Sequence, residues 1–184
     1  MNDIERSAIH ESGHAICHYL LYGNLDDIDY IEVHTDDSPI RGLCELVEEK
    51  QNICFSDFPN FSTLDGFTFW FQFMCFQVGG SCAELIICKD TEIDQEVLKY
   101  DLTIFDNLNL LHYKDFIGWE SRDASIIDSL AQVAIGFMVR LLSSNASHQS
   151  LIESVAQKLL KQKEKDNLRR LYSADIMDVI RNKG

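Results

Sequence analysis

The chain has 184 residues, of which 46% are hydrophobic and 25% charged, a composition typical of one globular domain with its own core. A formal net charge of −14 at pH 7 opposes non-specific binding to DNA, RNA and anionic lipid surfaces, so no nucleic acid is expected as a partner. The first residues are polar and acidic and lack the apolar stretch of a signal peptide, which predicts a cytoplasmic location.

The first predicted element is a helix over residues 3–22, and it contains the sequence His10-Glu11-Ser12-Gly13-His14. This is the His-Glu-x-x-His pattern of metal-dependent hydrolases. Residues four apart share a face of a helix, so His10 and His14 can bind one metal ion. Glu11 lies beside that face and can take a proton from a metal-bound water. Gly13 costs about 1 kcal/mol relative to alanine, which indicates that another element packs closely there.

Two strands are predicted after this helix. Residues 28–33 alternate between apolar and polar, and residues 40–47 form a second antiparallel strand after a turn at Asp36-Asp37-Ser38-Pro39. The edge of this hairpin near Ile31 to His34 is expected to hold an extended peptide by strand addition.

The strongly apolar run begins at Phe67 and predicts a buried core helix that continues through Gly79-Gly80 to Ile86. Its uninterrupted part has about a dozen residues, fewer than the roughly 20 that span a bilayer, so no membrane insertion is expected. The six cysteines include no Cys-x-x-Cys pair and are expected to be buried thiols of a reducing compartment.

The second half of the chain is predicted to be helical as well. Residues 89–120 are acidic and amide-rich and are interpreted as a surface insertion with some helix. Helices are predicted over residues 123–142, 151–165 and 174–180, with Ser173 as an N-cap of the last one. No linker or internal repeat divides the chain, so residues 1–184 are expected to form a single, mainly α domain with a small antiparallel β-hairpin.

A catalytic zinc ion usually has three protein ligands and one open position. The residues that can supply the third ligand include Asp123, Asp128, Glu84 and Asp94, or another histidine. Spacing alone does not choose among them.

The segment from Ala8 to Ala15 resembles the Ala-x-His-Glu-Ala-Gly-His-Ala segment of FtsH-type, ATP-dependent zinc proteases. Residues 79–86, Gly-Gly-Ser-Cys-Ala-Glu-Leu-Ile, are similar to that family's Gly-Gly-x-x-Ala-Glu-Glu-Leu-Ile segment, one acid shorter. The hairpin and the closing helices fall where the family has similar elements. Asp123, with Leu130 and Ala131 after it, resembles the family's third-ligand aspartate and the helix that follows it.

This resemblance implies a stand-alone FtsH-type peptidase domain with a zinc ion (Zn2+) held by His10, His14 and Asp123, and with Glu11 as the catalytic base. Its implied activity is hydrolysis of peptide bonds through a metal-activated water, so the implied enzyme is a zinc metalloendopeptidase acting on a polypeptide substrate. The segment of about 89–122 is longer than the family's usual connection and is expected to be an insertion.

The sequence contains no Gly-x-x-x-x-Gly-Lys-Ser/Thr phosphate loop, so it has no recognisable ATPase motor of its own. A substrate is therefore expected to be unfolded, flexible, or delivered by a separate ATPase or adaptor, and a homo-oligomer is a further expected form. Two alternatives stay open at this point: a non-catalytic relative of the same fold that acts as a binding or scaffold protein, and a hydrolase of small amides.

Overall fold

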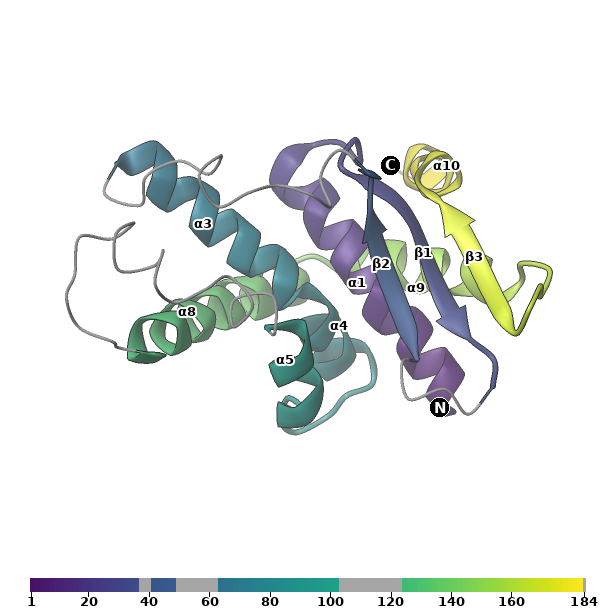
Figure 1. Cartoon of the computed structure of the whole chain (residues 1–184), viewed down its shortest axis with the longest axis horizontal. Helices are drawn as coiled ribbons and strands as arrows, with labels where there is room; N and C mark the ends of the chain where they lie inside the picture. Colours follow the sequence, from purple (N-terminus) through teal and green to yellow (C-terminus); the bar gives the residue numbers. More distant parts are fainter. Residues whose placement is uncertain (37–40, 49–62, 103–123, 184) are drawn as a thin grey trace.

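A computed structural model describes residues 1–36, 41–48, 63–102 and 124–183 of the chain. Helices dominate this structure, and a small antiparallel sheet covers one side of it (Figure 1). The predicted mainly α fold with an antiparallel hairpin is confirmed, although the sheet has three strands rather than two. The predicted turn at Asp36-Asp37-Ser38-Pro39 and the side chain of Asp123 lie largely or entirely outside the described residues.

The first helix, α1, spans Asp3–Tyr22, as predicted. Asn2 caps its first turn, because the Asn2 side chain accepts a hydrogen bond from the backbone N–H of Glu5 and the Glu5 side chain accepts one from that of Asn2. Gly23 ends the helix in the left-handed region at φ 76°, which only glycine adopts without a steric cost. Both ends of α1 are thus fixed by local sequence.

The sheet contains β1 (Ile28–His34), β2 (Gly42–Leu46) and β3 (Leu168–Tyr172), in the order β2-β1-β3. β3 is the unexpected strand, since no strand is predicted between the helices at residues 151–165 and 174–180. Because β1 pairs with a neighbour on each side, the expected addition of a peptide at Ile31 to His34 is wrong. Within the described part of the chain, β2 pairs with β1 alone, so no strand pairs with its outer edge.

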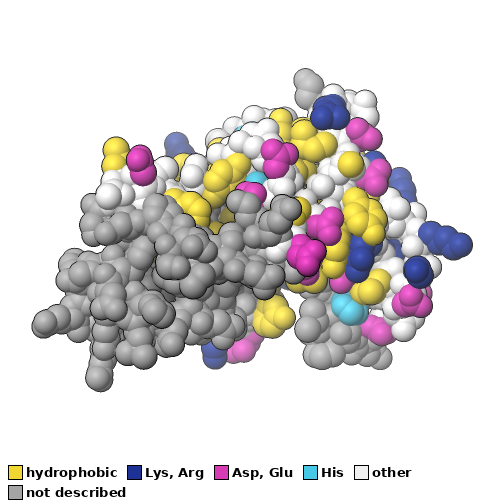
Figure 2. All heavy atoms as spheres, turned by 45° about the horizontal axis from the view of Figure 1, so that its top comes forward, with side chains coloured by type: hydrophobic (Ala, Val, Ile, Leu, Met, Phe, Trp, Pro, Cys, Tyr) yellow, Lys and Arg dark blue, Asp and Glu magenta, His cyan; other side chains and the backbone are white. Residues whose placement is uncertain are grey.

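The sheet has an apolar and a polar face. Ile31, Val33 and Leu171 are fully buried on the face toward α1 and α9, which lie behind the strands in Figure 1. On the other face, Arg170 donates from Nε and from its terminal nitrogen to Glu32, at 2.9 and 2.6 Å. Acidic side chains are spread over the surface seen in Figure 2, whereas lysine and arginine lie mostly on the side that carries β3 and α10.

The predicted core helix is two helices, α3 (Leu64–Gln77) and α4 (Gly79–Ile87), which meet at Val78. This break lets α4 turn against α1, where an ideal Cβ at Gly13 would lie 2.5 Å from the Cβ of Ala83. The close approach of a second helix at Gly13 is therefore confirmed. Among the described residues, no helix combines the length and the apolarity needed to cross a bilayer.

The remaining helices are α5 (Gln95–Asp101), α8 (Ala124–Ser143), α9 (Ala146–Leu160) and α10 (Ser173–Lys183). Helix α9 begins five residues before its predicted start, because the Asn145 side chain caps it by accepting from the N–H of Ser147. Helix α8 packs against α3 and α4, and α9 against α1, so that α1 runs through the centre of the molecule.

Candidate metal centre

His10 and His14 lie on one face of α1, and their Nε2 atoms are 3.0 Å apart. Both residues are buried, at 6% and 7% exposure. The prediction that the two imidazoles share one face of the helix is confirmed.

Each imidazole has its other nitrogen bound to an acceptor from a neighbouring helix. Nδ1 of His14 lies 2.9 Å from the backbone carbonyl oxygen of Phe76, which can only accept a hydrogen bond. Nδ1 of His10 lies 2.8 Å from Oε1 of the Glu84 carboxylate. Both rings therefore carry a proton on Nδ1, and in the neutral form both present the lone pair of Nε2. Two lone pairs that meet at 3.0 Å repel each other unless a cation lies between them.

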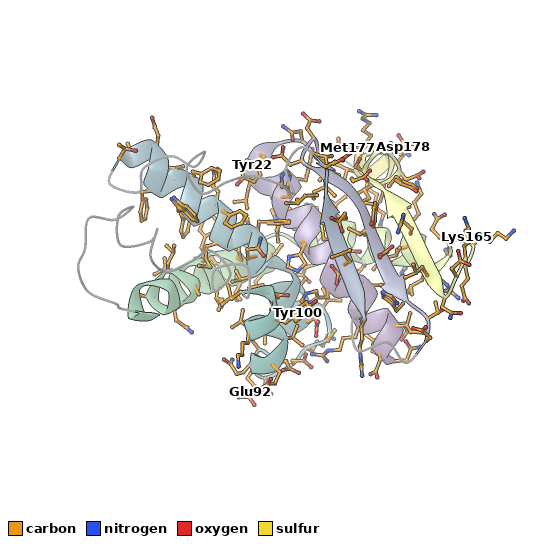
Figure 3. All side chains as sticks on the ribbon, viewed as in Figure 1. Tyr22, Glu92, Tyr100, Lys165, Met177 and Asp178 are labelled. Carbon is orange, nitrogen blue, oxygen red and sulfur yellow. The ribbon has the colours of Figure 1, made fainter. Side chains whose placement is uncertain are left out.

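A third donor atom reaches the same point from α5. Oδ1 of Asp101 lies 3.2 Å from Nε2 of His10 and 3.8 Å from Nε2 of His14. The end of α5 around Tyr100 lies beside α4 and α1 (Figure 3). The other carboxylate oxygen, Oδ2, accepts a hydrogen bond of 2.9 Å from the hydroxyl of Ser81 on α4. Asp101 is thus aimed at the two histidines by a neighbour that leaves Oδ1 free.

These three atoms are spaced like the ligands of one metal ion. With zinc–nitrogen and zinc–oxygen bonds of about 2.0–2.1 Å, two ligand atoms on a tetrahedron lie about 3.3 Å apart. The three observed distances of 3.0, 3.2 and 3.8 Å bracket that value. The group of His10, His14 and Asp101 can therefore hold a metal ion.

Gly80, on α4, leaves room for such an ion. An ideal Cβ at this position would lie 2.5 Å from Nε2 of His10 and 2.6 Å from Nε2 of His14. Those distances are far shorter than any normal contact of a carbon atom with nitrogen. The backbone of α4 therefore borders the space in front of both Nε2 atoms, and a side chain at position 80 would enter it.

The charges of the group are those of a cation site. Although burial by itself lowers the pKa of His10, its hydrogen bonds with Asp101 and Glu84 raise that pKa well above the ordinary value. Burial raises the pKa of Asp101, but its hydrogen bonds with His10 and His14 outweigh this and bring the pKa below its usual range. In the metal-free protein, a proton on His10 therefore takes the place of a positive ion.

Glu11 lies next to the three donor atoms, at 6% exposure. Burial raises the pKa of its carboxyl group, and the neighbouring His10 and His14 oppose this rise. The first residue of β2 passes directly over Glu11, because an ideal Cβ at Gly42 would come within 2.5 Å of its Oε1. The carboxyl group thus sits between the candidate metal site and the edge strand of the sheet.

Two of the acids predicted as candidates for the third ligand, Glu84 and Asp94, make other contacts in the structure. Glu84 contacts the far nitrogen of His10, and Asp94 caps α5 by accepting from the N–H of Glu96 at 3.0 Å. Asp123 lies outside the described residues, as does the side chain of Asp128. Asp101, which sequence reasoning missed, belongs to the segment interpreted as an insertion. Its one sequence signal is its place seven residues after the N-cap residue Asp94, at the end of a short helix.

The third histidine of α1, His18, is held by hydrogen bonds away from this group. Its Nδ1 lies 3.0 Å from the carbonyl oxygen of Asn24, and its Nε2 lies 3.5 Å from the Asp27 carboxylate. Burial lowers its pKa. His18 is thus a buried, hydrogen-bonded histidine outside the metal-binding group.

A cavity of about 570 Å³ lies beyond the first turns of α1, between Asn2, Ser7, His34 and Arg41. Its charged side chains are already paired, since Arg41 lies 2.7 Å from the carboxylate of Asp3 and His34 lies 3.7 Å from that of Asp36.

No known protein family and no curated protein matches the sequence of this chain. The function must therefore be argued from the site itself.

Proposed function

We propose that this chain is a zinc-dependent peptidase, similar to the peptidase domain of FtsH-type proteases, with His10, His14 and Asp101 as zinc ligands and Glu11 as the catalytic base. One observation carries the proposal: two Nε2 lone pairs and a buried carboxylate oxygen converge on one point beside a buried glutamate. A structural role alone gives no reason to bring these four groups together.

The donor set favours zinc over other cations. Two imidazole nitrogens with one carboxylate oxygen form the ligand set of catalytic zinc in several peptidases, whereas magnesium and calcium prefer oxygen ligands alone. Three protein ligands also leave one position open, as a catalytic site requires.

The proposal assigns the third ligand to Asp101 rather than to Asp123, which the family resemblance implied. Oδ1 of Asp101 is already within 4.8 Å of both Nε2 atoms, and its carboxylate is held there by Ser81. A ligand in this position needs no rearrangement of α1 or α4. The segment from residue 89 onward thus includes part of the site.

A zinc ion bound here supplies Lewis acidity, which polarises the substrate carbonyl and lowers the pKa of water. Glu11 accepts the proton of the attacking water and then delivers it to the leaving amine. Burial raises the pKa of Glu11, and this brings it closer to the neutral range in which a group can both accept and return a proton. Ser81 and Glu84 fix the orientation of Asp101 and His10 during these steps.

We infer that the substrate is an extended polypeptide that adds to the edge of β2. Gly42, at the start of this strand, lies over Glu11, so a peptide paired with β2 would pass the catalytic carboxyl group. An extended segment of this kind comes most readily from a chain that is not folded. A substrate that is unfolded, or that a separate ATPase or adaptor delivers, fits this geometry.

The test uses the full chain loaded with one equivalent of zinc and an intrinsically unfolded protein such as casein as substrate. We expect new amino termini, detected by mass spectrometry, and their loss in the Glu11→Gln variant with its zinc content unchanged. Zinc binding at one ion per chain without any cleavage would support the non-catalytic alternative. Cleavage of small amides but not of peptides would instead identify a different substrate class.

A further inference from the structure

Arg6 lies one helical turn before His10 on α1 and contacts the same carboxylate as that histidine. Nε of Arg6 pairs with Oε2 of Glu84, while Oε1 of Glu84 accepts the hydrogen bond from Nδ1 of His10 at 2.8 Å. A terminal nitrogen of Arg6 pairs with Oδ2 of Asp90. These contacts form one chain of four groups, from Asp90 through Arg6 and Glu84 to His10.

This chain uses both oxygens of the Glu84 carboxylate. The side chain of Glu84 is only 8% exposed, so protein groups rather than water decide how it is oriented. A carboxylate with one contact can rotate about its last carbon–carbon bond, whereas two contacts from successive turns of the same helix hold both oxygens. Residues four apart share a face of a helix, and Arg6 and His10 are four apart.

We propose that Arg6 is a positioning residue of the metal centre, which holds Glu84 in the orientation that presents Nε2 of His10 to the ion. The inference rests on the proposed metal binding, but it does not need peptidase activity. Asp90 positions Arg6 in turn, because it lies just beyond the end of α4 and engages the guanidinium nitrogen that Glu84 leaves free. A guanidinium can donate to two carboxylates from separate nitrogens in one fixed plane, a geometry that an ammonium group does not impose.

A simpler role for Arg6 is to tie α1 to α4 as an ordinary ion pair. That role predicts a loss of stability without a change in metal affinity. Partners of metal-ligating histidines typically change affinity by about 10–100-fold when they are lost. The zinc dissociation constant therefore separates the two roles.

The experiment measures that constant for the full-length protein by competition with a chromophoric chelator. We expect Arg6→Met to weaken zinc binding about tenfold and Arg6→Lys to weaken it less. The visible spectrum of the cobalt-loaded Arg6→Met variant is expected to differ from that of the parent, because the His10 ring is no longer held in place. Arg181→Met is the matched control, since Arg181 is 71% exposed and pairs with Asp178 within α10.

A double-mutant cycle tests whether Arg6 acts through Glu84. The combination of Arg6→Met with Glu84→Gln is expected to weaken zinc binding no more than Glu84→Gln alone. Additive losses, or an Arg6→Met protein that binds zinc within twofold of the parent, would overturn the proposal. If Arg6→Met does not fold, Asp90→Asn replaces it in the experiment. We expect Asp90→Asn to weaken zinc binding about threefold. Unchanged zinc binding in the Asp90→Asn variant would also overturn the proposal. A parent protein that binds no zinc would instead refute the proposed function.

Discussion

Gly42 of β2 lies directly against the carboxyl group of Glu11, so that a single added methyl group at position 42 would come within 2.5 Å of Oε1 and 2.7 Å of Cγ. Gly42 and Glu11 are 31 positions apart in sequence, yet no space is left between the backbone of the strand and the side chain on the helix. This contact links the edge strand, where a peptide is proposed to bind, to the proposed base.

Gly42→Ala is therefore expected to displace Glu11 without removing the metal ligands. We expect peptide cleavage to fall at least about tenfold, because proton transfer by a positioned base contributes about 10²–10⁴-fold. Zinc content, measured by atomic emission, is expected to stay at the parent level. Gly136→Ala is a suitable control, since the described structure places nothing within 4 Å of a Cβ there and alanine favours a helix by about 1 kcal/mol. A fully active Gly42→Ala protein would show that Glu11 does not act at this place.

Gly80→Ala is expected to prevent metal binding rather than to slow the reaction. Its Cβ would lie 2.5 Å from Nε2 of His10, in the space that an ion would use. Isothermal titration with zinc is expected to show at least a 100-fold weaker affinity than in the parent, because the two histidines would have to move apart. Unchanged zinc affinity would mean that the ion binds elsewhere.

Glu11→Gln is expected to stabilise the metal-free protein at pH 7, besides removing activity. The folded state raises the pKa of Glu11 above its unfolded value, so the folded protein binds this proton more tightly than the unfolded chain does. The group's contribution is therefore most favourable in acid and is lost as pH rises through the folded pKa. Thermal unfolding with a chelator present should show a gain in melting temperature from Glu11→Gln at pH 7 that disappears below about pH 4. A gain of the same size at both pH values would contradict this account.

Two buried serines provide a matched pair of substitutions. Among the described residues, Ser12 is fully buried and its hydroxyl has no hydrogen-bond partner, so Ser12→Ala is expected to be neutral or stabilising by up to about 1 kcal/mol in urea unfolding. Ser81→Ala removes the hydrogen bond to Oδ2 of Asp101 and is expected to weaken zinc binding about tenfold. Equal effects of the two changes on zinc binding would argue that Ser81 does not hold Asp101 in place.

The sequence predicts those parts of the fold that local signals define. The bounds of α1 follow from Asn2 as a cap and Gly23 as a terminator, and the His-Glu-x-x-His spacing places two imidazoles on one face of it. The break at Val78 was missed because apolar residues continue on both sides of it. The sequence does not predict strand β3 because its five residues, Leu-Arg-Arg-Leu-Tyr, do not alternate between apolar and polar.

The place of Asp101 beside the two histidines could not be predicted, for a different reason. His10 and Asp101 are 91 positions apart, and their contact depends on how α5 returns to α1 after the turn that follows α4. Periodicity describes one element at a time and contains no information on which distant acid meets it. A resemblance to a family can supply that information only where the spacing is kept, and the sequence predicts an insertion at residues 89–122.

Asp101 is the last residue of the seven-residue helix α5, in which Leu98 is the buried apolar residue. Two of the three proposed donors lie on the 20-residue helix α1, whereas the third lies on the short helix α5, which packs through Leu98 and through the contacts of the Asp101 carboxylate. A bound ion would then connect α5 to α1 through Asp101 and the two histidines. We therefore expect release of a bound ion to require the Asp101 carboxylate to move away from the two histidines.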